Sequence, residues 1–249
     1  MIQKWDPSSY AKDAAFVSMY GEELITLLAP IAGDKVMDLG CGDGFLAEKI
    51  AEMGCDVTGV DASEAQVGAA EKRGIKAVVG NGESLGFLDE FDSVLSNAAL
   101  HWMRRPEEVI ANVWQNLKPG GVFVGEMGAK GNVSAVVETL SALLERRGHN
   151  SELYNPWYFP TEEEYSELLV AQGFNINTTS TFSRPTKIKS DLLSWLRIFA
   201  QSFVAPIEEE RDSFYKEAET ALRPYLYSEK NGWIVDYVRL RFKVYRPSR

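Results

Sequence analysis

Apolar residues recur along the chain in short runs, and stretches with helical spacing separate these runs. The runs that fit buried strands are 35–39, 56–60, 75–79, 91–96 and 122–126. Between them, apolar positions three or four residues apart predict amphipathic helices. This alternation predicts an α/β fold: a parallel sheet with right-handed crossovers and helices on both faces.

The pattern changes after residue 126. Helical spacing continues at 133–144 and 161–172, and an aromatic loop at 154–160 lies between these segments. Alternation of apolar and polar residues then predicts strands at 174–182 and 238–244. The last strand has charged residues on its second face, which we expect to face water. The chain should therefore form one mostly parallel sheet of seven strands.

The same patterns divide the chain into four segments. They are a helical N-terminal segment, a sheet core, a helical insertion and the final strand, in residues 1–33, 34–182, 183–232 and 233–249. The first and third segments are rich in aromatic residues and should form a helical cap over the carboxyl ends of the strands. Because ligands of open α/β sheets bind at that edge, we expect the site between sheet and cap.

Composition narrows the classes of partner. The 249-residue chain has a formal net charge of −10, which argues against a nucleic-acid partner. No apolar run of about 18 residues occurs, so no membrane partner is expected. Cys41 and Cys55 lack the spacing of metal ligands. They favour a reduced, cytoplasmic protein without a metal.

A glycine-rich turn follows the first strand, in the sequence Asp38-Leu39-Gly40-Cys41-Gly42-Asp43-Gly44. Its glycines stand at positions i, i+2 and i+4, whereas a dinucleotide fingerprint places its third glycine at i+5. The shorter spacing suits a ligand that passes close to the backbone without a phosphate at the helix N-terminus. The alternative is a tight turn whose glycines only pack. The candidate contacts are Asp38, for an ammonium group of the ligand, and Gly40, Cys41, Gly42 and Gly44.

Two further elements follow the second and third strands. Asp61 and Ala62 end the second strand, where a carboxylate can accept hydrogen bonds from both hydroxyls of a ribose. The alternative for Asp61 is a helix cap. Asn81, Gly82 and Glu83 follow the third strand, where they can bind an adenine edge or simply form a turn. Three such elements at the ends of successive strands predict S-adenosylmethionine as cofactor and S-adenosylhomocysteine as its product.

The fourth strand leads into Asn97-Ala98-Ala99-Leu100-His101-Trp102. We expect Asn97 to lie along the methionine arm of the cofactor, with His101 and Trp102 near its sulfonium. His101 is the candidate catalytic residue, either as a general base or as a donor to the substrate. A cofactor contact and a merely packed histidine are the open alternatives.

These motifs resemble those of known enzymes. The glycine loop together with Asp61 resembles class I methyltransferases, which implies a Rossmann-like sheet. Residues 5–10, 97–102 and 239–246 are similar to trans-aconitate methyltransferase and its relatives. That resemblance implies that Tyr10 contacts cofactor and acceptor.

This chain also departs from those enzymes. His101 stands where trans-aconitate methyltransferases commonly have glutamine, and Asn81 stands where many class I enzymes have aspartate. The segment after the fifth strand does not match their pattern on the substrate side. The resemblance therefore implies the cofactor more firmly than the acceptor.

The methyl acceptor is expected to be a small molecule, and one basic stretch favours an anionic acceptor. Residues 184–197 carry four basic side chains and one acidic side chain. Arginine binds carboxylates through paired hydrogen bonds, although a solvated helix start is the plainer explanation. The candidate substrate contacts are Tyr10, Tyr20, Trp102, Trp157, Trp195 and Arg197. The first prediction is O-methylation of a trans-aconitate-like acid, whose carboxylate is ionised at neutral pH and needs no base.

Other functions remain open at this point. A phenolic or carbon acceptor would need a base, for which His101 is the candidate. A protein that binds S-adenosylmethionine without turnover would differ in no single residue. A nicotinamide-dependent oxidoreductase shares the fold but not this glycine spacing.

Overall fold

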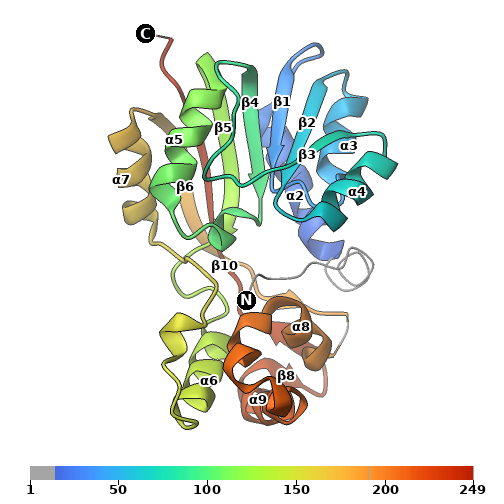
Figure 1. Ribbon diagram of the computed structural model, residues 1–249, viewed down its shortest axis with the longest axis vertical. Coiled ribbons are helices and arrows are strands. Elements are labelled where there is room, and N and C mark those ends of the chain that lie inside the picture. The colour runs from blue at the N-terminus through green and yellow to red at the C-terminus, as the bar shows by residue number, and fades with distance from the viewer. Residues whose placement is uncertain (1–14, 190, 249) are drawn as a thin grey trace.

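The computed structural model describes residues 15–189 and 191–248. Seven strands of this described part form one sheet in the order β3-β2-β1-β4-β5-β10-β6 (Figure 1). Their bounds are β1 (Lys35–Leu39), β2 (Asp56–Asp61), β3 (Lys76–Val79), β4 (Phe91–Asn97), β5 (Leu117–Gly128), β6 (Asn175–Ser183) and β10 (Val238–Tyr245). All neighbouring pairs are parallel except the two that include β10. The predicted mostly parallel, seven-stranded sheet is confirmed.

Helices cover both faces of the sheet. On one face, α2 (Ala15–Leu28), α3 (Phe45–Glu52) and α4 (Glu64–Lys72) contribute to one apolar cluster with β1, β2 and β4. On the other, α5 (Pro106–Asn116) and α7 (Glu162–Gln172) pack on β4, β5 and β10. The short helix η1 (Leu100–Trp102) follows β4. Burial of one apolar stripe on each helix stabilises this layered arrangement.

A second lobe lies beyond one end of the sheet (Figure 1). It contains α6 (Ser134–Glu145), η2 (Ser151–Leu153), α8 (Leu192–Phe199), η3 (Gln201–Glu210), α9 (Arg211–Leu226) and the short strands β7 (Thr186–Lys187), β8 (Tyr227–Ser228) and β9 (Gly232–Val235). The short strands pair antiparallel in the order β7-β9-β8. Apolar residues from 133 to 235 form its separate core.

The division of the chain differs from the predicted boundaries in two places. Helix α6 was expected in the sheet core, but Val136, Leu140 and Leu144 are buried in the second lobe with residues of α9. Helix α2 was expected in the cap, but Leu24 and Leu28 pack against the sheet. Their apolar stripes fit these surfaces equally well, so periodicity alone could not assign them. Residues 1–14 of the predicted N-terminal cap lie outside the described residues.

The charged face of β10 is not solvated as expected. Arg239 is buried, and Lys243 donates a hydrogen bond of 2.7 Å to the carbonyl oxygen of Leu27 on α2. Arg241 is paired with Glu23 of the same helix at 2.7 Å. Helix α2 therefore covers this face at Arg241 and Lys243, and its carboxylate and carbonyl groups pair with these two side chains.

Candidate active site

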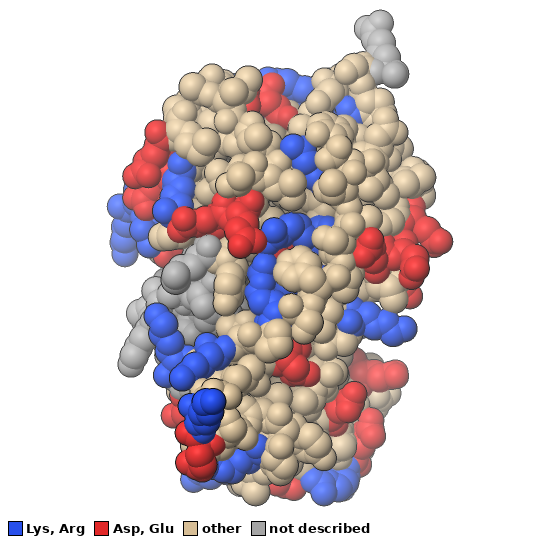
Figure 2. Space-filling view, turned by 180° about the vertical axis from the view of Figure 1, so that it is seen from behind, with Lys and Arg blue, Asp and Glu red and all other residues tan. Residues whose placement is uncertain are grey.

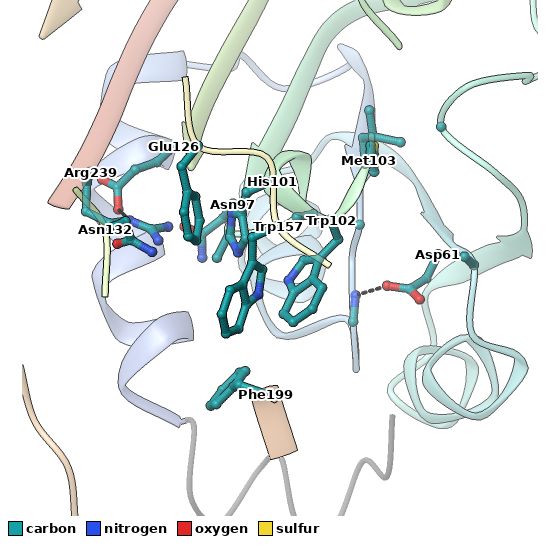
Figure 3. A pocket seen from close by; sticks show the side chains of 18 of the residues that line it. Asp61, Asn97, His101, Trp102, Met103, Glu126, Asn132, Trp157, Phe199 and Arg239 are labelled. Atoms are coloured by element: carbon teal, nitrogen blue, oxygen red, sulfur yellow. Dashed lines mark hydrogen bonds and ion pairs between the residues drawn. The ribbon is translucent and has the colours of Figure 1, made fainter. Parts of the chain in front are cut away.

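A cavity of about 470 Å³ lies between the carboxyl ends of the strands and the second lobe. Residues of both parts line it, and Figure 3 shows Asp61 and Met103 on one side with Glu126 and Arg239 on the other. The site residues predicted from the sequence that line this cavity are Tyr20, Gly40, Gly42, Asp61, Ala62, Asn81, Gly82, Glu83, Asn97, His101, Trp102, Trp157 and Trp195. We call its two ends the glycine-loop end, formed after β1 to β3, and the arginine end, at Glu126, Arg184 and Arg239. Tyr10 lies outside the described residues.

The glycine loop brings backbone to the wall of the cavity. Gly40 has a φ of +77°, and a Cβ built on it would lie 2.1 Å from the Cβ of Ala99. Gly42 has a φ of +55°, and a Cβ there would meet no atom within 4 Å. Gly40 is therefore required for packing as well as for its backbone angle, whereas Gly42 borders open space where a ligand can lie against the backbone.

Three of the predicted loop contacts, Asp38, Cys41 and Gly44, do not line the cavity. Asp38 is 2% exposed and lies near the backbone N–H of Ala47, in the first turn of α3, which acts to lower its pKa. Gly44, the N-cap of that helix, has no side chain to cap it. Burial, followed by the nearby carboxylate of Asp61, raises the pKa of Asp38 to about 7. Cys41 is also buried, and burial raises the pKa of its thiol.

Asp61 holds the glycine loop to the start of α4. Its Oδ2 accepts a hydrogen bond of 3.0 Å from the backbone N–H of Gly42, and its Oδ1 accepts one of 2.9 Å from that of Ser63. Burial raises its pKa, although these two hydrogen bonds oppose the shift. A carboxylate can accept about four hydrogen bonds, so both oxygens can still accept from ligand hydroxyls in the cavity.

The turn after β3 closes the glycine-loop end. Asn81 accepts a hydrogen bond of 3.0 Å from the backbone N–H of Glu83, whose carboxylate accepts one of 2.9 Å from Nε of Arg105. Burial acts to raise the pKa of Glu83, but hydrogen bonds from Arg105 and Asn81 lower it overall. A Cβ on Gly82 would lie 2.8 Å from Sδ of Met103, so the backbone lies close under an apolar side chain.

His101 lies between the two ends of the cavity (Figure 3). Its Nδ1 accepts a hydrogen bond of 3.3 Å from the backbone N–H of Gly128. Burial lowers its pKa well below the ordinary value, and the charge of Arg239 acts in the same direction. The imidazole is therefore neutral, with its proton on Nε2. In this tautomer His101 is a hydrogen-bond donor to the cavity rather than a base.

Aromatic side chains form one wall of the cavity beside His101. Trp157 and Phe159 are stacked with ring centroids 5.7 Å apart, and Trp102 meets Trp157 edge-on at 5.8 Å. From α8, Trp195 and Phe199 lie 5.0 Å apart. We call these five residues the aromatic wall. The three tryptophans are among the acceptor contacts predicted from the sequence, and the two phenylalanines are not.

The arginine end is built around one buried carboxylate. Glu126, at the end of β5, is 1% exposed. It accepts hydrogen bonds from Nη1 and Nη2 of Arg184 at 2.5 and 3.1 Å, and from Nε of Arg239 at 3.2 Å. Nη2 of Arg241 donates to it at 2.7 Å. We call these four residues the arginine cluster. On the molecular surface, Figure 2 shows Lys and Arg side chains at the level where the lobe meets the sheet.

Electrostatics in the cluster follow from this sharing. Burial acts to raise the pKa of Glu126, but the charges of Arg239 and Arg184 outweigh it and lower that pKa. Burial lowers the pKa of Arg239 although Glu126 opposes the change. One carboxylate therefore compensates the arginines only in part.

Comparison with known proteins identifies the family. A family profile described as "Methyltransferase domain" matches residues 37–125. An uncharacterised methyltransferase of Schizosaccharomyces pombe is 35% identical over 97% of this chain and 98% of its own length. The chain belongs to the S-adenosylmethionine-dependent methyltransferases.

One further relative and one solved structure are similar to this methyltransferase. Trans-aconitate 2-methyltransferase of Mycobacterium tuberculosis is 26% identical over 89% of this chain and 87% of its own. The crystal structure of a methyltransferase of unassigned activity from Bacillus halodurans covers 91% of this chain and 98% of its own, with a TM-score of 0.63 and 17% identity. At that identity the structural likeness shows the shared fold alone.

The glycine-loop end of the methyltransferase fits S-adenosylmethionine. A ligand can fill the open space at Gly42, and the carboxylate of Asp61 lines the same end of the cavity. The carboxylate of Asp61 there suits a cofactor with a positive sulfonium. Among residues 15–189 and 191–248, no three His, Cys, Asp or Glu side chains are grouped to hold a metal ion, and no helix is long and apolar enough to cross a membrane.

Arg197, the arginine predicted from the sequence as an acceptor contact, lies outside the cavity. Arg197 is exposed, pairs with Asp212 at 3.1 Å and is absent from the lining. Its place on α8 is one that periodicity puts on the outer face of the helix. Arg184 and Arg239, which do line the cavity, were noted only as part of a basic stretch and as part of a charged strand face. The one signal for Glu126 was a carboxylate at the end of an otherwise apolar strand.

Proposed function

We propose that this methyltransferase transfers the methyl group to a carboxylate oxygen of a small anionic acid. The observation that carries the proposal is the division of charge in one cavity. Asp61, whose carboxylate accepts hydrogen bonds from backbone N–H groups, lies at the glycine-loop end, and Arg184 and Arg239 lie at the other. A cationic cofactor and an anionic acceptor therefore find complementary charge at opposite ends. The relative from M. tuberculosis, named for trans-aconitate, supports a carboxylic acid as acceptor.

Four elements of the chain would hold the cofactor. The backbone at Gly42 would border the methionine arm, and Asp61 would accept hydrogen bonds from the ribose. Gly82 would offer backbone groups to the adenine beneath Met103, and Asn97 would lie along the methionine arm. Helix α2 approaches this region closely, because a Cβ on Gly21 would lie 2.7 Å from Nδ2 of Asn97.

The chain has little acid–base chemistry to perform in this reaction. When bound, S-adenosylmethionine supplies the methyl group, whose bond to sulfur breaks as the carboxylate oxygen bonds to carbon, with the electron pair staying on sulfur. The acceptor carboxylate is already ionised at neutral pH. The residues of the cavity orient the two reactants and exclude water, which favours a reaction that removes two opposite charges.

His101 would act as a donor that orients the acceptor. Its Nδ1 is already bonded to the backbone N–H of Gly128, and its proton is on Nε2. A phenolic or carbon acceptor would need a base, and burial lowers the pKa of His101 away from the range of an effective one. This geometry favours the carboxylate over those acceptors.

The stability of the product to alkali tests the proposal. The purified protein is incubated with methyl-labelled S-adenosylmethionine and separate panels of carboxylic acids, phenols and carbon acids. We expect label in products from the acids alone, released as volatile methanol by mild alkali, because methyl esters hydrolyse there. Label that survives alkali, as an ether or a C-methyl group does, would overturn the proposal.

A further inference from the structure

Arg239 has unused donors that face the cavity. Its side chain is 7% exposed, and its Nε donates to Glu126. Its Nη1 and Nη2 have no hydrogen-bond partner among the described residues, and Arg239 lines the cavity. A guanidinium that is nearly buried loses solvation, so donors without partners are costly unless a ligand satisfies them.

The charge of the arginine cluster leaves room for one anion. Within the described residues, Arg184, Arg239 and Arg241 share Glu126, and Glu23 adds a second carboxylate to Arg241 at 2.7 Å. The excess is one positive charge. Both terminal nitrogens of Arg184 already donate hydrogen bonds to the two oxygens of Glu126. Arg239 is therefore the arginine that can bind a ligand carboxylate through two hydrogen bonds.

The backbone of Gly128 links Arg239 to His101. Arg239 is the partner of Gly128 in the pairing of β10 with β5, and the N–H of Gly128 donates to Nδ1 of His101. Both side chains line the cavity, so a carboxylate held by Arg239 would lie on the side of His101, and the Nε2 proton of His101 could bind the same group. Figure 3 shows His101 and Asn97 on the side of Arg239 that leads toward Asp61.

The remainder of the arginine end offers no second cation. The charged residues that line the cavity there are Glu126, Arg184 and Arg239 in the described part of the chain, and the aromatic wall and the uncharged polar residues Asn132, Thr186 and Tyr237 line the rest. A second or third carboxylate on the acceptor would be placed against aromatic rings and uncharged polar groups without a cation, which costs desolvation energy. A flat or apolar body is favoured there.

From these contacts we propose that Arg239 binds the carboxylate that is methylated, and that the acceptor is a monocarboxylate with an apolar body lying on the aromatic wall. This inference rests on the proposed carboxylate methylation. The step removes the negative charge of the acceptor: an oxygen lone pair forms the bond to the methyl carbon, and the carbon–sulfur electron pair stays on sulfur. The ester no longer pairs with Arg239, which favours its release.

A matched acceptor series tests the chemistry on the wild-type enzyme. The probes are 3-phenylpropenoate, its primary amide, 2-butenoate and trans-aconitate, and the readout is kcat/KM for alkali-labile methyl ester. We expect 3-phenylpropenoate to exceed both 2-butenoate and trans-aconitate by about tenfold or more, since a buried ring and an unpaired charge each change binding by over 1 kcal/mol. The amide should give no product.

Two variants and a control test the role of Arg239. In Arg239→Met we expect kcat/KM for 3-phenylpropenoate to fall about 50-fold or more, as for loss of a buried charged hydrogen bond. Arg239→Lys keeps the charge but loses the fork and should fall by less. Arg147→Met is the control, because Arg147 pairs with Glu210 and Glu217 in the second lobe away from the cavity. Calorimetric affinity for S-adenosylmethionine, expected unchanged in all three, confirms folding.

The outcomes separate the two proposals. If trans-aconitate is the better acceptor, or if Arg239→Met turns over 3-phenylpropenoate normally, the inference is overturned and carboxylate methylation stands. If Arg239→Met loses cofactor affinity as strongly as turnover, Arg239 does not act on the acceptor and the inference is likewise overturned. If no acid is methylated while phenols are, the proposed function itself fails.

Discussion

The two ends of the cavity are built in different ways. At the glycine-loop end, the contact between Gly42 and Asp61 joins residues 19 apart, and that between Asn81 and Glu83 joins residues two apart. At the arginine end, Glu126 is bonded to residues 58, 113 and 115 positions away. One end uses backbone and short-range turns, and the other uses side chains that only the complete fold brings together.

This difference separates what is general in the enzyme from what is particular. Backbone groups at strand ends can bind any molecule with the cofactor's shape, and local sequence specifies them. The arginine cluster depends on the position of β10 between β5 and β6, and on the lobe that closes over it. Changes at this end can alter acceptor choice while the cofactor site is kept.

The largest effect should follow loss of the buried carboxylate. Glu126→Gln leaves three arginines without their shared anion, so we expect the free energy of unfolding to fall by about 3–5 kcal/mol. Urea denaturation measures the loss. The control is Glu208→Gln, which removes an exposed pair with Arg211 and should cost about 0–1 kcal/mol. Equal losses in the two variants would contradict a special role for the buried cluster.

The same carboxylate predicts how stability depends on pH. The arginines hold the pKa of Glu126 in the folded protein below its ordinary value, so its contribution is present above the unfolded pKa, near 4.3, and is lost as pH falls through the folded pKa. The difference in unfolding free energy between wild type and Glu126→Gln should therefore shrink below about pH 4. A difference that stays constant down to pH 2.5 would contradict this sign.

At the other end, one glycine should matter to the ligand and another only to the fold. Gly42→Val and Gly33→Val both force a branched residue into a left-handed backbone, at about 1–2 kcal/mol of stability. Both have open space at Cβ, but only Gly42 borders the cavity. Calorimetry should show S-adenosylmethionine binding abolished in Gly42→Val and kept in Gly33→Val. Retained binding in Gly42→Val would place the cofactor elsewhere.

A smaller effect on cofactor affinity is expected at Asp61. Asp61→Ala should weaken S-adenosylmethionine binding by about 1–3 kcal/mol, because ribose hydroxyls and the N–H of Gly42 lose an acceptor. Asp43→Ala is the control, since Asp43 lies in the same loop but pairs with Arg73 outside the cavity. Isothermal titration measures both. Equal affinity of Asp61→Ala and wild type would remove Asp61 from the ribose site.

The fold, and the residues that line the glycine-loop end of the cavity, could be predicted from the sequence because both depend on local patterns. The spacing of glycines and the apolar runs are visible in short windows, and the seven-stranded sheet was predicted correctly. The buried state of Arg239 was not predicted, since alternation marks that face of β10 as solvated. Only the placement of α2 and Glu126 shows that the charges are enclosed. Helix α6 was assigned to the sheet core for a related reason, because an apolar stripe on a helix does not show which surface the helix packs against.

The smallest effect is expected at the residue that sequence reasoning chose first for anion binding. Arg197 is exposed on α8 and pairs with Asp212, so Arg197→Ala should change the free energy of unfolding by about 0–1 kcal/mol. It does not line the cavity, so kcat/KM for a carboxylate acceptor should stay within about twofold of wild type, less than 0.5 kcal/mol. Arg184→Ala is the matched comparison, because it removes a lining arginine that is bonded to Glu126 and should lower kcat/KM strongly. Steady-state kinetics of the three proteins at one salt concentration decide the matter. A drop in Arg197→Ala as large as that in Arg184→Ala would mean that acceptors are captured by the outer charge of the lobe. The acceptor site, unlike the local cofactor site, would then include residues on the outer surface of α8.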